Sequence, residues 1–177
     1  MKIYITSGPS GSGKSTYYEN NKEKLNNPVL VCPDNIRELL FGDVSIQKEG
    51  EKVWRIAYEK MYEAIREKQD VYFSATFCSY RFILEVLKKI DRECYKEEER
   101  AEVVILRFKD GEDLNLLEER VKKDLEQKKN RSNTLMVNEK SETVIQKQRE
   151  NFLKIDFERI KKSSKWLKNI YLSIKNV

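Results

Sequence analysis

The feature that most constrains this chain is a phosphate-loop motif close to its first residue. Residues 8–16 read Gly-Pro-Ser-Gly-Ser-Gly-Lys-Ser-Thr, which fills the pattern G-x-x-x-x-G-K-[ST]. The β-branched and aromatic run at 2–6 predicts a buried strand, and the segment 16–25, which lacks Pro and Gly, predicts a helix. Strand, glycine-rich turn and helix are the context that the motif requires, so the sequence predicts binding of a nucleoside triphosphate.

Each part of the motif has an expected role in binding the triphosphate. Glycines let the backbone curl so that its N–H groups point inward onto a phosphate chain. We expect Lys14 to reach the β- and γ-phosphates and Ser15 to hold Mg²⁺, so the expected ligands are ATP, or another nucleoside triphosphate, and Mg²⁺. The residues expected to bind the nucleotide are Gly8, Ser10, Gly11, Ser12, Gly13, Lys14, Ser15 and Thr16.

The rest of the chain alternates between strand and helix patterns. Strands are predicted at 29–32, 71–74, 103–108 and 170–174, and helices at 35–40, 51–68, around 82–90, 114–127 and 139–165. A charged connection is expected at 95–100 and an irregular polar stretch at 128–138. This alternation predicts a three-layer α/β fold of the P-loop NTPase type, with a parallel sheet of about five strands covered by helices on both faces. We expect a single domain, 1–177, with the nucleotide at the carboxyl ends of the strands.

Composition narrows the possible chemistry. The chain has no histidine, so a histidine general base is excluded and proton transfer falls to Asp or Glu. Three widely spaced cysteines, Cys32, Cys78 and Cys94, favour neither a disulfide framework nor a zinc site. No apolar run reaches the length of a membrane span, and no leader pattern is visible. We therefore expect a cytoplasmic, reduced protein without membrane contact or an evident protein partner.

The net charge of +5 is concentrated near the end of the chain. Residues 154–175 carry seven basic and two acidic side chains, an excess equal to that of the whole chain. Such a surface can meet nucleic-acid phosphates, although it is also typical of a solvated helix.

Candidates for an acceptor site follow the second strand. Transfer of a phosphoryl group to a hydroxyl needs a carboxylate at the acceptor, basic groups that hold the acceptor, and mobile cations over the phosphoryl. Asp34 comes just after that strand, where it could also cap the next helix, and Arg37 lies one turn further on the same face. A cationic lid is expected over about residues 120–138, with these basic residues: Arg120, Lys122, Lys123, Lys128, Lys129 and Arg131.

An ATP- or GTP-hydrolysing switch or motor is the alternative from another class. Such proteins usually have an acidic metal-holding residue at the end of a buried strand and a residue that positions the attacking water. Here the third strand ends Ser74-Ala75-Thr76, and Asp110 follows the fourth in a turn-like Lys-Asp-Gly. A guanine-reading Asn-Lys-x-Asp tetrapeptide is also missing. These features favour a kinase over a GTPase or a large motor.

The phosphate loop at 8–16 together with Pro33-Asp34-Asn35-Ile36-Arg37 resembles the phage-type polynucleotide 5′-hydroxyl kinase family, within the AAA-type ATP-binding kinases. In that family a strand ends in an aspartate that acts as general base on the polynucleotide 5′-hydroxyl. An arginine three residues later grips the acceptor phosphate. The resemblance implies these two roles for Asp34 and Arg37.

The third strand resembles that family in part. Thr76 matches the threonine of the family's Asp-x-Thr-Asn strand end, which implies a substrate-binding role for it. Ser74 or Ala75 stands where the family has aspartate, and Phe77 replaces the asparagine. The absence of the family's aspartate and asparagine here affects how the substrate strand is held and which groups surround the metal.

The lid supplies the remaining implied residues. The resemblance places Arg120 on the nucleotide and Arg131 on the transferring phosphoryl, so the implied catalytic residues are Lys14, Asp34 and Arg131. The implied activity is ATP-dependent phosphorylation of a polynucleotide 5′-hydroxyl. Kinases of nucleosides or nucleotides, of a modified DNA base or of activated sugars remain alternatives, as does a non-kinase ATPase.

Overall fold

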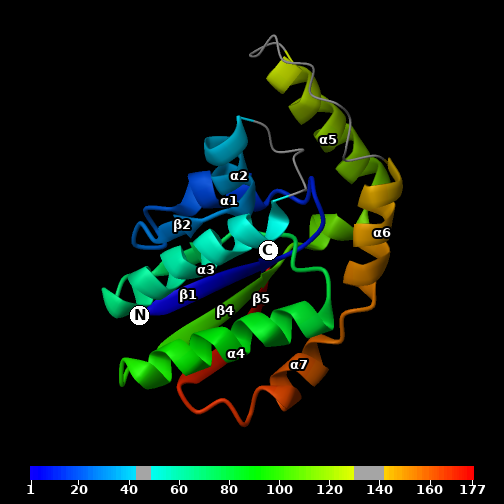
Figure 1. The fold of residues 1–177 in the computed structure, drawn as a ribbon. Helices are drawn as coiled ribbons and strands as arrows, with labels where there is room; N and C mark the ends of the chain where they lie inside the picture. The colour runs from blue at the N-terminus through cyan, green and yellow to red at the C-terminus, as the bar shows by residue number, and fades with distance from the viewer. Residues whose placement is uncertain (43–48, 130–141) are drawn as a thin grey trace.

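The five expected strands form one parallel sheet in the computed structural model, which describes residues 1–42, 49–129 and 142–177 (Figure 1). The strands are β1 (Lys2–Ser7), β2 (Val29–Val31), β3 (Val71–Phe73), β4 (Ala101–Arg107) and β5 (Ile170–Asn176), in the order β2-β3-β1-β4-β5. Strand β1 pairs with both β3 and β4, with Ile5 in register with Phe73 and Ile105. Its central place puts the phosphate loop at the middle of the sheet's carboxyl edge, where ligands bind in folds of this kind.

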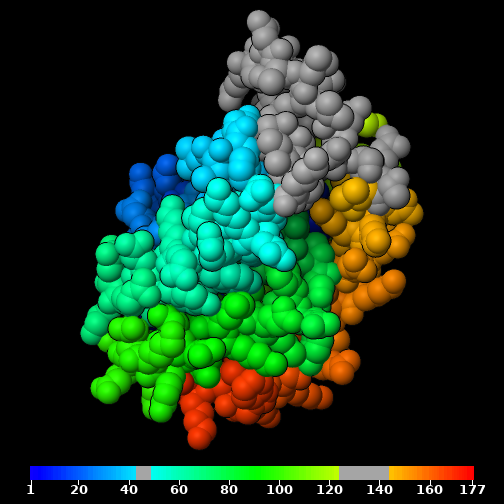
Figure 2. Space-filling model, in the orientation of Figure 1, coloured from blue at the N-terminus to red at the C-terminus, as the bar shows by residue number. Residues whose placement is uncertain are grey.

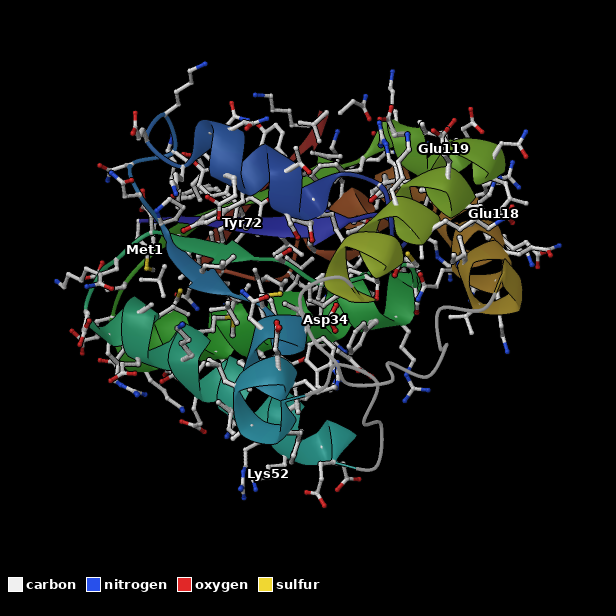
Figure 3. All side chains as sticks on the ribbon, turned by 90° about the horizontal axis from the view of Figure 1, so that it is seen from above. Met1, Asp34, Lys52, Tyr72, Glu118 and Glu119 are labelled. Atoms are coloured by element: carbon white, nitrogen blue, oxygen red, sulfur yellow. The ribbon has the colours of Figure 1, made fainter. Side chains whose placement is uncertain are left out.

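Helices cover both faces of the sheet. They are α1 (Lys14–Asn21), α2 (Pro33–Phe41), α3 (Gly50–Arg66), α4 (Tyr80–Lys96), the short 3₁₀ helix η1 (Lys109–Glu112), α5 (Leu114–Lys129), α6 (Glu142–Leu153) and α7 (Phe157–Ser163). Helices α3 and α4 lie in front of the sheet in Figure 1, and their side chains hide it in Figure 2. Viewed from above, α1 lies on the opposite face (Figure 3). No helix in the described ranges combines the length and the apolar character that crossing a bilayer requires.

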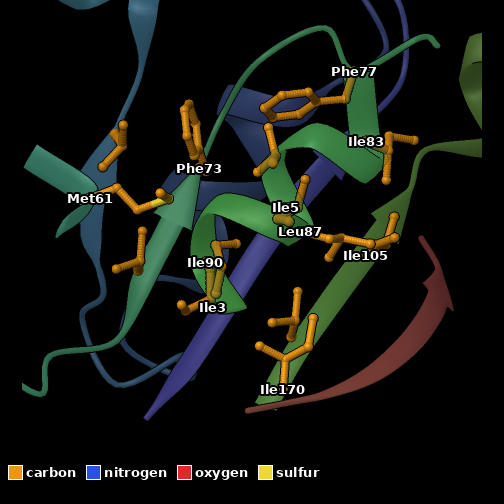
Figure 4. Packing of buried hydrophobic residues seen from close by; sticks show 14 of the residues in the cluster. Ile3, Ile5, Met61, Phe73, Phe77, Ile83, Leu87, Ile90, Ile105 and Ile170 are labelled. Atoms are coloured by element: carbon orange, nitrogen blue, oxygen red, sulfur yellow. The ribbon is translucent and has the colours of Figure 1, made fainter. Parts of the chain in front are cut away.

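The alternation of side chains along β1 divides the core in two. Ile3 and Ile5 point to one face, where they pack with Phe73, Ile105 and apolar residues of α3 and α4 (Figure 4). Tyr4 points to the other face and packs in a smaller cluster against α1. Because successive residues of a strand point to opposite sides, one continuous apolar strand serves both cores. The predicted three-layer α/β fold is confirmed.

The start of α2 differs from the prediction in its cap. Cys32 is the N-cap residue and Pro33 the first helical residue, so Asp34 lies in the first turn and the predicted N-cap role of Asp34 is wrong. Proline suits that first position because its fixed φ is already helical and its missing N–H would have no partner there. Gly42 ends the helix, with a φ of 68° and an N–H bonded to the carbonyl of Glu38. The carboxylate of Asp34 is therefore not used on its own helix terminus.

Three other predicted boundaries are wrong for local reasons. The helix expected at 16–25 begins at Lys14 and ends at Asn21, because Asn26 and Asn27 adopt positive φ in the following turn. Helix α4 continues through Tyr95 and Lys96, which were expected in a connection. Helix α5 continues to Lys129, so the first residues of the expected irregular stretch are helical; the rest of that stretch lies outside the described residues.

The prediction of one continuous helical region at 139–165 is also wrong, because this region contains two helices. Helix α6 ends at Leu153, and Asp156 caps α7 by accepting a hydrogen bond from the Arg159 N–H at 2.9 Å. The cap satisfies an N–H group that the start of a helix leaves unpaired. The break lets α6 lie beside α5 while α7 packs against α4, as Figure 1 shows.

Candidate active site

Helix α1 begins directly after the phosphate loop and has no side-chain cap at its first turn. Gly13 is the N-cap residue of this helix, with a φ of 90°, and no side chain there accepts a hydrogen bond from the first turn. The first turn also contains no acidic residue. The unpaired N–H groups and the positive end of the helix dipole therefore remain available to an anion.

The ammonium group of Lys14 lies over the loop that precedes it. Its Nζ donates to the carbonyl of Gly8 at 2.9 Å, to the carbonyl of Pro9, and to the Ser12 hydroxyl at 3.3 Å. These contacts hold the positive charge on the concave side of the loop. Lys14 is thus already close to where phosphate oxygens would bind, as the motif predicts.

Hydroxyl groups of the sheet fix the loop from beneath. The Thr6 Oγ1 donates to the carbonyl of Ala75 at 2.9 Å, and the Ser7 Oγ donates to that of Phe77 at 2.7 Å, which ties the end of β1 to the segment after β3. The buried Tyr72 hydroxyl donates to the backbone carbonyl of Lys14 at 2.9 Å. Burial raises the pKa of Tyr72, so this hydroxyl remains protonated and keeps donating.

Helix α5 packs directly onto the loop at Gly11. A Cβ atom on Gly11 would lie 2.8 Å from the carbonyl oxygen of Leu117 and 3.2 Å from a methyl carbon of Val121. The φ of Gly11 is 80°, which L-residues with a side chain rarely adopt. Both the backbone conformation and the available space therefore require glycine here.

We predict that Gly11→Ala lowers the free energy of unfolding by at least about 1–2 kcal/mol and weakens ATP binding, because it adds strain at positive φ to a collision with α5. Thermal unfolding and ATP titration measure the two effects. Gly50→Ala is the matched control, since Gly50 has open space around its Cβ position and no positive φ. An alanine at position 11 that behaves like the one at position 50 would contradict the prediction.

Asp34 and Arg37 meet as the sequence spacing predicts. The Arg37 Nη1 donates to the Asp34 Oδ1 at 2.7 Å, and the two side chains lie one turn apart on α2. Arg37 is only 6% exposed, whereas 55% of the Asp34 side chain remains accessible. The Nε atom of Arg37 is buried and has no hydrogen-bond partner among the described residues. A buried arginine therefore holds a carboxylate that is itself largely accessible.

Arg120 reaches the phosphate loop from α5. Its Nη1 pairs with the Asp110 Oδ2 at 2.9 Å and donates to the carbonyl of Gly11 at 3.4 Å. A Cβ atom on Gly13 would lie 3.9 Å from the same guanidinium. Arg120 thus lies beside the loop, near the expected position of the nucleotide, and the ion pair with Asp110 orients its guanidinium group.

One cavity of about 690 Å³ joins these groups. Its wall combines the phosphate loop, the first turn of α2, the residues after β3 and the inner side of α5. Asp34 lies near the carboxyl ends of the strands, toward the opposite end of the sheet from Met1 (Figure 3). The lining residues are Ser10, Gly11, Ser12, Gly13, Lys14, Ser15, Thr16, Tyr17, Asn20, Asn21, Cys32, Asp34, Asn35, Ser74, Ala75, Thr76, Phe108, Asp110, Arg120, Val121, Lys123 and Val177.

The end of β3 contributes small polar groups and no acid to this wall. Ser74 and Thr76 both line the cavity, and the Ser74 N–H donates to the carbonyl of Val31 at 2.8 Å. Cys32 lines the cavity as well, but burial raises the pKa of its thiol, so it is protonated at neutral pH and unsuited to nucleophilic attack. Within the described lining, Asp34 and Asp110 are the side-chain carboxylates, and Asp110 is paired with Arg120.

The structure brings most of the sequence-predicted residues together. The loop residues from Ser10 to Thr16 line the cavity, as do Asp34, Thr76 and Arg120, whereas Gly8 does not line it and Arg37 contacts the lining residue Asp34. Arg131 lies outside the described residues. The described lining includes no basic residue of the stretch 154–175.

Sequence reasoning missed five residues that shape this site. Thr6 and Ser7 tie the end of β1 to the segment after β3, Tyr72 and Gln148 bond Lys14 and Ser10 of the loop, and Asp110 pairs with Arg120. Two hydroxyl residues at the end of an otherwise apolar strand were a visible signal for Thr6 and Ser7. Gln148 is 138 residues away from its partner Ser10, so no local pattern could have linked them.

The residues present suit a magnesium ion that is held mainly by a phosphate chain. Ser15 is exposed at the start of α1 and lines the cavity, so its hydroxyl is the group that would hold Mg²⁺. No group of three or more His, Cys, Asp or Glu side chains in the described ranges could hold a metal by itself. Phosphate oxygens and water would then complete the octahedron that Mg²⁺ requires, and the ion would neutralise phosphate charge.

A family model described as an AAA domain matches residues 3–154, which is most of the chain and includes the phosphate loop and Asp34. None of the curated proteins matches the chain closely enough to count as a relative.

Several of the similar solved structures are described as kinases. A candidate kinase from Chloroflexus aurantiacus j-10-fl has a TM-score of 0.60 at 12% identity, over 94% of this chain and 98% of that one. Shikimate kinase from Acinetobacter baumannii gives a TM-score of 0.47 at 18% identity, over 98% and 82% of the two chains. Deoxyadenosine kinase from M. mycoides gives 0.46 at 16% identity, over 98% and 91%. At such identities the likeness shows the fold alone, which is a kinase-like P-loop α/β fold.

Proposed function

The chain belongs to the AAA domain family, and from that premise we propose that it is an ATP-dependent phosphotransferase, which moves the γ-phosphoryl group of ATP to a hydroxyl. One observation carries the proposal: the phosphate loop and the accessible carboxylate of Asp34 line the same cavity. A phosphate loop alone suits any triphosphate-binding protein. A carboxylate on the wall of the same cavity supplies the group that a hydroxyl acceptor needs beside its reacting oxygen.

In the proposed reaction, Asp34 takes the proton of the acceptor hydroxyl as that oxygen attacks the γ-phosphorus. The bond from phosphorus to the β–γ bridging oxygen breaks, and ADP leaves. Lys14 and the N–H groups at the start of α1 stabilise the charge that develops on the phosphoryl and the leaving group. Positioning and electrostatics supply most of the catalysis, because the phosphoryl passes between two oxygens without a covalent enzyme intermediate.

Arg37 orients the base in this proposal. Its bond to the Asp34 Oδ1 holds that carboxylate on the wall of the cavity. The phosphate grip that the family resemblance implies would require the buried guanidinium to move toward the cavity, with its Nε as a spare donor. We assign Thr76 to the acceptor and Arg120 to the nucleotide, and their place in the lining of the same cavity supports this assignment.

The acceptor that we propose is the 5′-hydroxyl of a polynucleotide. The spacing of Asp34 and Arg37 relative to the loop supports it through the resemblance to the phage-type kinases. The absence of an acid at the end of β3 leaves the alternatives in place: a nucleoside or nucleotide, a modified base within DNA, or an activated sugar. A polynucleotide acceptor would bind with a strong dependence on salt, whereas an uncharged nucleoside would not.

We predict that γ-labelled ATP transfers its label to DNA or RNA oligonucleotides with a 5′-hydroxyl. Oligonucleotides of the same sequence with a 5′-phosphate are the matched control and stay unlabelled, because the reacting oxygen is blocked. Nucleosides, nucleotides and UDP-sugars complete the panel. Label on one of these small molecules would contradict the polynucleotide acceptor but still support kinase activity. Labelled free phosphate alone would support the alternative that the protein hydrolyses ATP.

A further inference from the structure

The inner face of α6 carries one polar residue among apolar ones. Ile145, Gln148 and Phe152 recur at three- and four-residue steps, so they share one side of the helix. Ile145 is 2% exposed and packs in a cluster with residues of α5, and Phe152 is 1% exposed. Between them the Gln148 Oε1 accepts a hydrogen bond from the Ser10 N–H at 2.9 Å. The polar side chain on this apolar face thus reaches the phosphate loop.

The surrounding contacts set the position of Gln148. The neighbouring Arg149 Nε donates to the carbonyl of Glu112 at 2.6 Å, which fixes α6 on η1. A Cβ atom on Gly111 would lie 2.6 Å from Pro9 Cδ and 3.3 Å from Phe152 Cε1, so η1 touches the loop and α6 at the same point. The side chain of Gln148 is therefore held between packed elements.

The bonded amide belongs to a sensitive part of the loop. Ser10 is 5% exposed and directly precedes Gly11, whose positive φ turns the chain toward the phosphate-binding N–H groups. A buried N–H without a partner is unfavourable, so losing this acceptor would favour other orientations of the peptide between Pro9 and Ser10. Those orientations would redirect the N–H groups that follow.

We propose that Gln148 is a positioning residue of the triphosphate site: it keeps the phosphate loop in its ligand-binding shape by accepting the Ser10 amide. This inference rests on the proposed function, since it assumes that the loop binds ATP. It makes α6 part of the donor site, although the helix lies far from the motif in sequence. Gln148 acts from behind the loop and is not among the residues that line the cavity.

The test replaces Gln148 by methionine, which has similar length and helix propensity but accepts hydrogen bonds only weakly. Gln148→Met is expected to bind ATP about five- to tenfold more weakly, the size of one hydrogen bond's net contribution, while its melting temperature stays close to that of the control. Gln146→Met is the matched control: the same residue type on the same helix, but exposed and bonded to Glu150.

Hydrogen exchange gives a second readout that does not depend on ATP binding. In the wild-type protein without nucleotide, the Ser10 amide should exchange slowly, and it should exchange faster in Gln148→Met. Fast exchange in the wild type, or wild-type ATP affinity in Gln148→Met, would overturn the inference and leave the proposed function intact. Failure of the wild-type protein to bind ATP would instead overturn the proposed function, and this inference with it.

Discussion

Replacing Lys14 by alanine is expected to reduce phosphoryl transfer by two to three orders of magnitude. The ammonium is the charged side chain held on the concave face of the loop, where its Nζ contacts the carbonyl of Gly8 and the hydroxyl of Ser12. A preorganised charge aimed at a transferring phosphoryl contributes about 3–4 kcal/mol to stabilising the transition state. Initial rates with labelled ATP, together with ATP titration of the variant, measure the effect on transfer and on binding separately.

Lys24→Ala is the control for the loss of one positive charge. Lys24 is exposed in the turn after α1 and is not among the lining residues, so its removal should leave the rate within about twofold of the wild type. Melting temperatures of both variants exclude unfolding as the cause. Undiminished transfer by Lys14→Ala would show that the donor site has been assigned to the wrong residues.

Replacing Asp34 by asparagine is expected to lower the transfer rate by about 10²–10⁴-fold, the usual contribution of a general base, and to change ATP affinity much less. Asparagine keeps the size of the side chain and an oxygen that can accept from Arg37, but it cannot take up the acceptor proton. We expect the rate and the ATP affinity to respond differently because Asp34 lies on α2, whereas the proposed binding site of the triphosphate is the loop and the start of α1. Steady-state kinetics with each substrate varied in turn measures kcat and both KM values.

Glu38→Gln provides the matched control on the same helix. Glu38 is exposed, one turn beyond Asp34, and it does not line the cavity, so loss of its charge should leave kcat unchanged within about twofold. Two outcomes would count against Asp34 as the base. One is equal activity of Asp34→Asn and Glu38→Gln; the other is a loss at Asp34 that appears wholly in ATP affinity.

The donor half of the site was predictable because its chemistry is local. A loop that wraps a phosphate chain needs its glycines and its lysine at fixed spacing, so the motif at 8–16 can be recognised without any tertiary information. The five strands were predictable for a similar reason: central parallel strands are buried on both faces and read as short continuous apolar runs. The one-turn spacing of Asp34 and Arg37 also predicted that both lie on the same face of the helix after the second strand.

Helix boundaries were less predictable because competing local effects decide them. The pair Asn26–Asn27 turns the chain early after α1, and the Asp156 cap divides what periodicity reads as one helix. Asp34 was expected as a cap because its residue type favours that position. The proline before it fits the first helical position, which moves the cap back to Cys32 and leaves Asp34 one residue inside.

By itself, the sequence determined the loop, its strand and helix, the alternating α/β order and the Asp34–Arg37 spacing, because each depends on residues close together in the chain. Only the tertiary structure decided which distant groups meet at the loop. It set Arg120 against Asp110, buried Arg37 behind Asp34, and brought the amide oxygen of Gln148 to Ser10. The physical reason is that packing of α5 and α6 onto the loop, and the sheet order that places β1 between β3 and β4, are set by long-range burial of apolar surface, which no local spacing records.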